Sequence, residues 1–113
     1  MNNTVILVTR FGTGQSQITD LPLQLIEKYL ELLLQNNELP NAICFYADGV
    51  KLTVIGSPVL KQLKELEGKG VRLIICSTCL GAMDLSRNVQ VGIVGGMPDI
   101  VEAQMKADKV ISI

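Results

Sequence analysis

Short apolar runs rich in β-branched residues alternate with longer amphipathic stretches, and this alternation constrains the fold more than any other feature. The runs cover Thr4–Thr9, Asn41–Tyr46, Val71–Ile75, Val91–Val94 and Val110–Ile113. Nearly continuous apolar character is typical of strands buried on both faces. The stretches between them are long enough to be helices that join parallel strands. The pattern predicts an α/β fold with a mainly parallel sheet that helices cover on both faces.

The stretches between the runs show helical signals. Leu21–Gln35 places polar side chains every three or four positions, which gives one polar stripe on an otherwise apolar helix. Ser57 is expected to cap a second helix that Pro58 begins, and a glycine after that helix is expected to end it in a left-handed conformation. Shorter helices are expected at about Thr78–Met83 and at Pro98–Ala107.

The length of 113 residues predicts a single domain, residues 1–113, and the charge limits its partners. Ten Lys and Arg against eleven Asp and Glu leave a net charge of −1. A chain without a basic excess is not expected to bind nucleic acid or an anionic membrane. No apolar run approaches the roughly 18 residues of a transmembrane helix, and the N-terminus lacks the basic flank of a signal peptide. Three cysteines, an odd number, then indicate reduced thiols in the cytoplasm.

The chain has no histidine, which removes several kinds of active site. Ser-His-Asp and Cys-His nucleophile systems are excluded, as are HExxH metal sites. A structural zinc site needs four ligands, so two closely spaced cysteines complete one only if two subunits share it. We therefore expect neither a metal nor a cofactor.

Candidate site residues gather in loops that follow the predicted strands. Ligands of parallel α/β sheets bind at the carboxyl ends of the strands, so these loops should share one edge. The loops are Arg10–Ser16, Ala47–Lys51, Cys76–Cys79 and Gly95–Met97. The candidate catalytic residues are Cys76 and Cys79, and the candidate binding residues are Arg10, Gly12, Gly14, Lys51 and Gly95.

Cys76 and Cys79 form a CxxC motif between a strand and a short helix. Free N–H groups at a helix N-terminus stabilise a thiolate, which is the reactive form, and Lys51 or Arg10 across the edge would add positive charge. The alternative interpretation is structural, because free cysteines often pack as small apolar residues. Cys44 lies inside a predicted strand and is expected to be an inert core thiol.

The glycines at Gly12 and Gly14 follow the first predicted strand, where a phosphate-binding loop would lie. The loop has neither the GxGxxG pattern nor the GK[ST] that nucleotide sites carry. A tight turn is the interpretation that the spacing favours.

A set of short segments, in fitting order and spacing, carries a family likeness. The segments are Phe45–Leu52, Gly56–Leu60, Leu63–Val71, Cys76–Leu80, Ile100–Glu102 and Lys106–Ile111. With them the chain resembles the DsrE/DsrF-like family, and its likeness is closest to the C-terminal, sulfurtransferase-like domain of YedF-type selenium-metabolism proteins. The chain departs from that pattern at Asp84, where the family usually has a glycine, and in Arg10–Ser16, which replaces an acidic stretch.

The resemblance implies a three-layer α/β/α sandwich around a parallel five-stranded sheet (DsrEFH-like) and assembly into a homotrimer or homohexamer. In sulfur-relay relatives of the TusD type, a cysteine after the third strand carries a persulfide. That cysteine matches Cys76, and Cys79 matches the extra thiol of the YedF-like subgroup. The resemblance therefore implies a cytosolic sulfurtransferase or persulfide carrier that exchanges sulfur with a protein partner.

Two other functions fit the same residues. A CxxC motif between a strand and a helix is also typical of thioredoxin-type dithiol redox proteins, although Ile75 stands where such proteins have tryptophan. The chain could instead be a non-catalytic binding or assembly module whose thiols are incidental.

Overall fold

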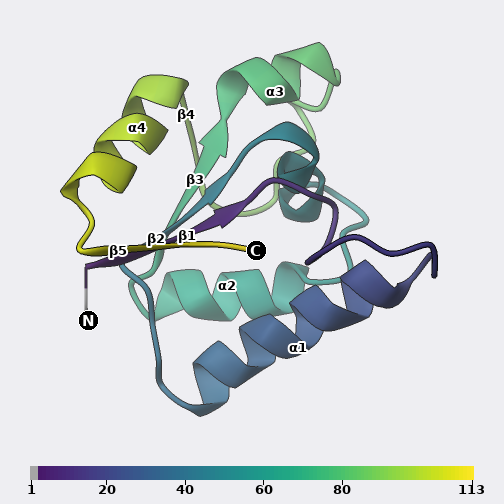
Figure 1. Cartoon of the computed structure of the whole chain (residues 1–113). Helices are drawn as coiled ribbons and strands as arrows, with labels where there is room; N and C mark the ends of the chain where they lie inside the picture. The colour runs from purple at the N-terminus through teal and green to yellow at the C-terminus, as the bar shows by residue number, and fades with distance from the viewer. Residues whose placement is uncertain (1–2) are drawn as a thin grey trace.

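The sheet of this protein is parallel throughout. The computed structural model describes residues 3–113, and within them five strands form one sheet in the order β4-β3-β2-β1-β5 (Figure 1). Each pair of neighbours is parallel, which confirms the predicted fold class. The strands are β1 (Thr4–Val8), β2 (Ala42–Phe45), β3 (Arg72–Cys76), β4 (Ile93–Gly95) and β5 (Lys109–Ser112).

Helices lie on both faces of the sheet. The long helices α1 and α2 lie side by side below the sheet in Figure 1, and α4 lies above it. The short helix α3 follows β3 directly, and a 3₁₀ helix, η1, follows β2. The helices are α1 (Leu21–Gln35), α2 (Leu60–Gly68), α3 (Ser77–Ala82), α4 (Met97–Lys106) and η1 (Ala47–Thr53).

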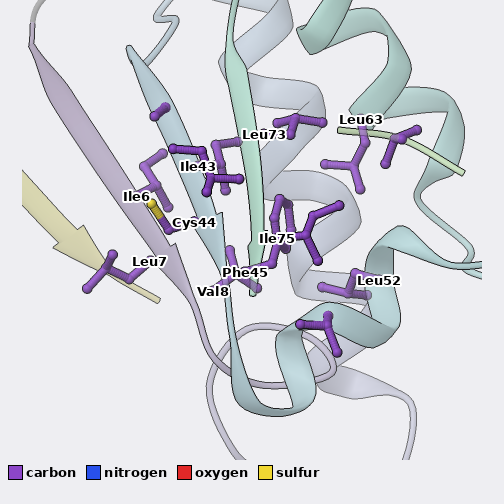
Figure 2. Packing of buried hydrophobic residues seen from close by; sticks show 14 of the residues in the cluster. Ile6, Leu7, Val8, Ile43, Cys44, Phe45, Leu52, Leu63, Leu73 and Ile75 are labelled. Atoms are coloured by element: carbon purple, nitrogen blue, oxygen red, sulfur yellow. The ribbon is translucent and has the colours of Figure 1, made fainter. Parts of the chain in front are cut away.

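The apolar side chains of the central strands form the core with the inner stripes of α1 and α2. Ile26 and Leu30 of α1 and Leu63 of α2 are buried against the sheet. Figure 2 shows Phe45 and Ile75 of neighbouring strands among these side chains. Each such side chain contributes about 2 kcal/mol through its burial, which is why the strands are apolar along their whole length.

The start of α2 and the loop after β2 differ from the sequence prediction. The helix begins at Leu60 with Val59 as its N-cap, and Ser57 instead caps the turn before it, its hydroxyl oxygen accepting the Val59 N–H at 3.2 Å. Ala47–Thr53 is a 3₁₀ helix where a loop was expected. The left-handed glycine predicted after α2 is Gly70, with φ of +95°.

Candidate functional site

The end of β3 brings two cysteines together. Arg72–Cys76 runs through the core, so Cys76, its last residue, is still only 1% exposed. On the neighbouring edge strand, Gly95 of β4 lies beside Cys76. The chain turns directly into α3, and Cys79 lies in the first turn of that helix, partly exposed.

The sulfur of Cys79 is held between two groups. It accepts a hydrogen bond from the backbone N–H of Ala47, with an N···S distance of 3.2 Å. The thiol of Cys76 lies close enough to influence the protonation of Cys79. Ala47 has a φ of +50° at the point where β2 passes into η1, so the turn after β2 aims this amide at the thiol. The site thus joins the carboxyl ends of β2 and β3 to α3.

These surroundings control the proton on Cys79. Burial raises the pKa of the Cys79 thiol, and its hydrogen bond with Cys76 and the negative charge that Cys76 can carry raise it further. The Ala47 amide acts in the opposite direction. The pKa of Cys79 therefore shifts upward, whereas the position at a helix N-terminus led us to expect a thiolate. Burial outweighs the effect of the Ala47 amide, which is the one group that lowers the pKa of Cys79.

Cys44 lies apart from this pair. It is completely buried in β2, where Figure 2 shows it close to the β1 strand. Its register partners are Leu7 of β1 and Ile74 of β3. Burial raises its pKa to about 11, although the charge of Arg72 lowers it. Cys44 is therefore a core thiol, as its sequence position predicted.

Lys51 and Arg10, the two cations that the sequence suggested near the thiols, have surroundings of their own. Lys51 is paired with Asp48 inside η1, with an N–O distance of 3.3 Å. Arg10 lies at the ends of β1 and β5, away from β3 in the strand order. Neither is among the groups that shift the pKa of Cys79. A position after a strand end does not decide which groups an exposed side chain contacts. Those contacts depend on the partners that the side chain finds nearby in the folded protein.

The predicted glycines have three different environments. Gly95 is beside Cys76, and a Cβ there would lie 2.8 Å from the Asp99 carboxylate. Gly14 lines a separate cavity with Arg10. Gly12, at a φ of +137°, packs so closely that a Cβ would lie 2.5 Å from the Pro22 carbonyl carbon. Gly12 therefore has a packing role in the loop.

Sequence reasoning missed two contacts, one at Cys79 and one at the start of α4. The Ala47 amide has no sequence signature, because any residue except proline carries an N–H. Asp99 fixes the corner between β4 and α4, its carboxylate accepting the Gly96 N–H at 2.8 Å. The spacing of Gly96 and Asp99 is that of a helix N-cap and its third residue, a signal that could have revealed this contact.

Metal-binding clusters and membrane-spanning helices were also sought in the described part of the chain. Among residues 3–113, no three His, Cys, Asp or Glu side chains are close enough to hold a metal ion. Over the same residues, every helix is too short or too polar to cross a bilayer.

A small, all-parallel α/β domain with a thiol pair at the carboxyl end of an interior strand defines the structural class of this protein. The chain belongs to the DsrE/DsrF-like family, whose sequence pattern matches residues 5–113. That family is associated with sulfur relay. A comparison with curated proteins finds no match.

Solved structures share the fold over nearly the whole chain. The YchN protein of E. coli superposes with a TM-score of 0.73 at 17% identity, covering 100% of both chains. MTH1491 of Methanobacterium thermoautotrophicum has a TM-score of 0.69 at 21% identity, covering 97% of each. BT1422 of Bacteroides thetaiotaomicron has a TM-score of 0.66 at 18% identity, covering 97% of this chain and 93% of its own. At these identities the likeness concerns the fold.

Proposed function

We propose that this protein is a sulfurtransferase or persulfide carrier, in which Cys76 holds a sulfur atom and Cys79 controls its release. The closeness of the two thiols at the junction of β3 and α3, in a chain of this family, is the observation that carries the proposal. Resemblance to TusD-type carriers supports Cys76 as the persulfide residue. The YedF-like segments support a cytosolic role with a protein partner, in sulfur or selenium metabolism.

Loading needs no histidine. The Cys76 thiolate attacks the outer sulfur of a donor persulfide, R–S–SH. A new S–S bond forms at Cys76, the donor S–S bond breaks, and the donor leaves as a thiolate with the electron pair. The products are the Cys76 persulfide and R–S⁻, which takes up a proton from water. The step requires a thiolate and access to it, and no general base.

Release follows one of two routes. An acceptor thiolate can attack the outer sulfur of the persulfide, which returns Cys76 as a thiolate. Alternatively, the Cys79 thiolate attacks the inner sulfur, forming a Cys76–Cys79 disulfide while hydrosulfide leaves with the electron pair. A thiol reductant then restores both thiols.

The exposures of the two thiols suit these roles. Cys76 is 1% exposed, so a persulfide there is protected from thiols in solution. Cys79 is partly exposed and is the thiol that a donor or acceptor meets first. Loading of Cys76 then requires a local movement that exposes its sulfur.

Mapping the added sulfur by mass spectrometry tests this proposal. After treatment with inorganic polysulfide and trapping with an alkylating reagent, we expect an added sulfur atom at Cys76. Cys76→Ser should abolish that label, and Cys44→Ser, the matched control, should retain it. If the Cys76→Ser protein forms as much persulfide as the parent protein, the sulfur is carried by Cys79 and the proposal for Cys76 is contradicted.

Thioredoxin-type redox chemistry is the alternative that the thiol contact also permits. It predicts that the reduced protein reduces insulin disulfides catalytically, without a need for sulfane sulfur. The persulfide proposal predicts no more insulin reduction than an equal amount of free dithiol gives. A lack of both activities would favour a binding or assembly module.

A further inference from the structure

The outer side of β5 is an open edge of the sheet. β5 is the last strand in the strand order, and it pairs with β1 on its inner side (Figure 1). Val110 is 43% exposed, and Ser112 is exposed as well. β5 contains no proline and pairs with β1 without a bulge, so two common protections of an edge strand are missing. The edge is therefore available to another strand.

The backbone groups that point outward from this edge belong to Val110 and Ser112. Successive residues of a strand direct their N–H and C=O groups to opposite sides. The Ile113 N–H donates to the Leu7 carbonyl of β1 at 3.1 Å, so the odd-numbered residues of this segment face β1. Val110 and Ser112 consequently direct their N–H and C=O groups away from the sheet.

We propose that a second copy of this chain pairs with β5 in antiparallel orientation about a two-fold axis, which joins the two sheets into one. Residues that face each other in an antiparallel pair can exchange both of their hydrogen bonds. Val110 of each copy then faces Ser112 of the other copy, and every outward N–H and C=O of β5 has a partner. Ile111 lies between these pairs, directly opposite Ile111 of the second copy.

The backbone of β5 determines this register. A shift by two residues toward Asp108 sets Val110 opposite its own copy and Ser112 opposite Asp108. Asp108 does not supply the missing donor, because its N–H already donates to the Asn3 carbonyl at 2.8 Å. The opposite shift leaves Val110 facing no residue of β5. A shift by one residue sets outward-facing groups against groups that already bond to β1.

The side chains of β5 also fit a second copy. Ile111 lines an apolar cavity of about 440 Å³ on the α1 side of the sheet, with Leu33 and Leu39 on its wall. Pairing sets two such apolar walls side by side across the axis, which removes apolar surface from water. Lys109, the charged residue of β5, falls opposite Ile113 of the second copy, so like charges do not face each other.

A folded partner suits this edge better than a flexible peptide, the other partner that an open edge strand can take. β5 has four residues, and only Val110 and Ser112 offer hydrogen bonds. A flexible peptide loses conformational freedom when it orders on the edge, and these few bonds offset little of that cost. A second copy brings a strand that is already ordered in its own sheet.

Disulfide trapping tests the pairing and its register. Opposite residues of a non-hydrogen-bonded antiparallel pair have Cα atoms about 4.5 Å apart, which a disulfide spans. In a Cys79→Ser background, which removes the partly exposed native thiol, Ile111→Cys should yield a disulfide-linked dimer on mild oxidation. Val110→Cys, the matched control at the neighbouring position, should not, because its two copies lie beyond the roughly 7 Å that a disulfide allows.

A proline variant tests the backbone hydrogen bonds. Ser112→Pro removes an N–H that points away from β1, so each sheet keeps its own hydrogen bonds. The particle mass from light scattering should fall to half that of the parent protein at micromolar concentration. Ser112→Ala, the matched control, keeps the N–H and should keep the parent mass. An unchanged circular dichroism spectrum shows that the proline variant is folded.

Several results would overturn the proposal. Failure of Ile111→Cys to cross-link, or equal cross-linking of Val110→Cys, would show that the strands do not pair in this register. A parent mass that is an odd multiple of 12.3 kDa would leave a β5 edge without a partner. A folded Ser112→Pro protein with the parent mass would show that assembly does not use this edge. None of these readouts depends on thiol chemistry at Cys76, so they stand apart from the persulfide proposal.

Discussion

The three cysteines show how far the surroundings of one side chain decide its chemistry. Cys44 is sealed between strands, Cys76 is buried at a strand end, and Cys79 is partly exposed against a backbone amide. The sequence predicted the core position of Cys44 from its apolar neighbours and the pairing of the other two from their spacing. It could not predict the raised pKa of Cys79, because burial depends on packing that is distant in sequence.

Because the buried Cys44 thiol has a raised pKa, the free energy of unfolding should fall at high pH. Its pKa is about 11 in the folded protein against an ordinary value of 9.0. Below pH 9 the thiol is protonated in both states, and between about pH 9 and 11 only the unfolded chain releases the proton. The free energy of unfolding should therefore drop by about 3 kcal/mol across that window. Urea unfolding at several pH values measures the drop, which should shrink in Cys44→Ala; an equal drop in that variant would assign it to other groups.

Asp84 occupies a backbone conformation that suits the glycine usual in the family. Its φ is +55°, in the left-handed region. Asp84→Gly should raise the free energy of unfolding by about 0.5 kcal/mol, because relief of strain exceeds the added entropy of the unfolded chain. Asp20→Gly, at a φ of −95°, is the matched control and should lower it. Denaturant melts compare the two, and a loss of stability in Asp84→Gly would contradict the strain.

At the scale of elements, the apolar runs predicted the strands well, whereas the sequence predicted the short connections between elements poorly. β4 was expected at Val91–Val94 and is Ile93–Gly95, because Gly92 turns with a φ of +80° against Leu73. η1 was missed because a 3₁₀ helix has weak periodicity and is held by tertiary contacts. The expectation that the thiol pair lies at the carboxyl end of a parallel strand nevertheless agrees with its position at the end of β3.

Gly49 fixes η1 against β1. A Cβ at this position would lie 2.0 Å from the Val8 carbonyl oxygen. Gly49→Ala should therefore cost about 2 kcal/mol of stability and loosen the contact between Ala47 and Cys79. Gly68→Ala, at a helical position with open space around it, should be neutral or stabilising. Thermal melts of both proteins provide the comparison, and equal melting temperatures would contradict the close packing.

At the scale of the whole molecule, apolar side chains are exposed along β4 and α4. Ile93 is 66% exposed and Met105 is 80% exposed, with Val94, Met97 and Val101 also open. A surface of this kind is typical of a protein interface. A mean hydropathy of +0.36 points in the same direction.

We predict a homotrimer or homohexamer, formed through this surface. Light scattering should report three or six times the 12.3 kDa chain mass. Val101→Glu should lower that mass, because a charge at the interface is desolvated on assembly. Ile18→Glu, at a more exposed apolar position before α1, should leave it unchanged. A mass of 12.3 kDa for the parent protein would contradict the assembly.

The most direct test of the account is whether Cys79 acts on a sulfur atom held by Cys76. The protein is loaded with polysulfide, freed of excess reagent, and followed without added thiol by intact mass and by released sulfide. We expect each loaded chain to release one sulfide and gain a Cys76–Cys79 disulfide, while Cys79→Ser keeps its persulfide. Equal release from Cys79→Ser, or release without the disulfide, would contradict it.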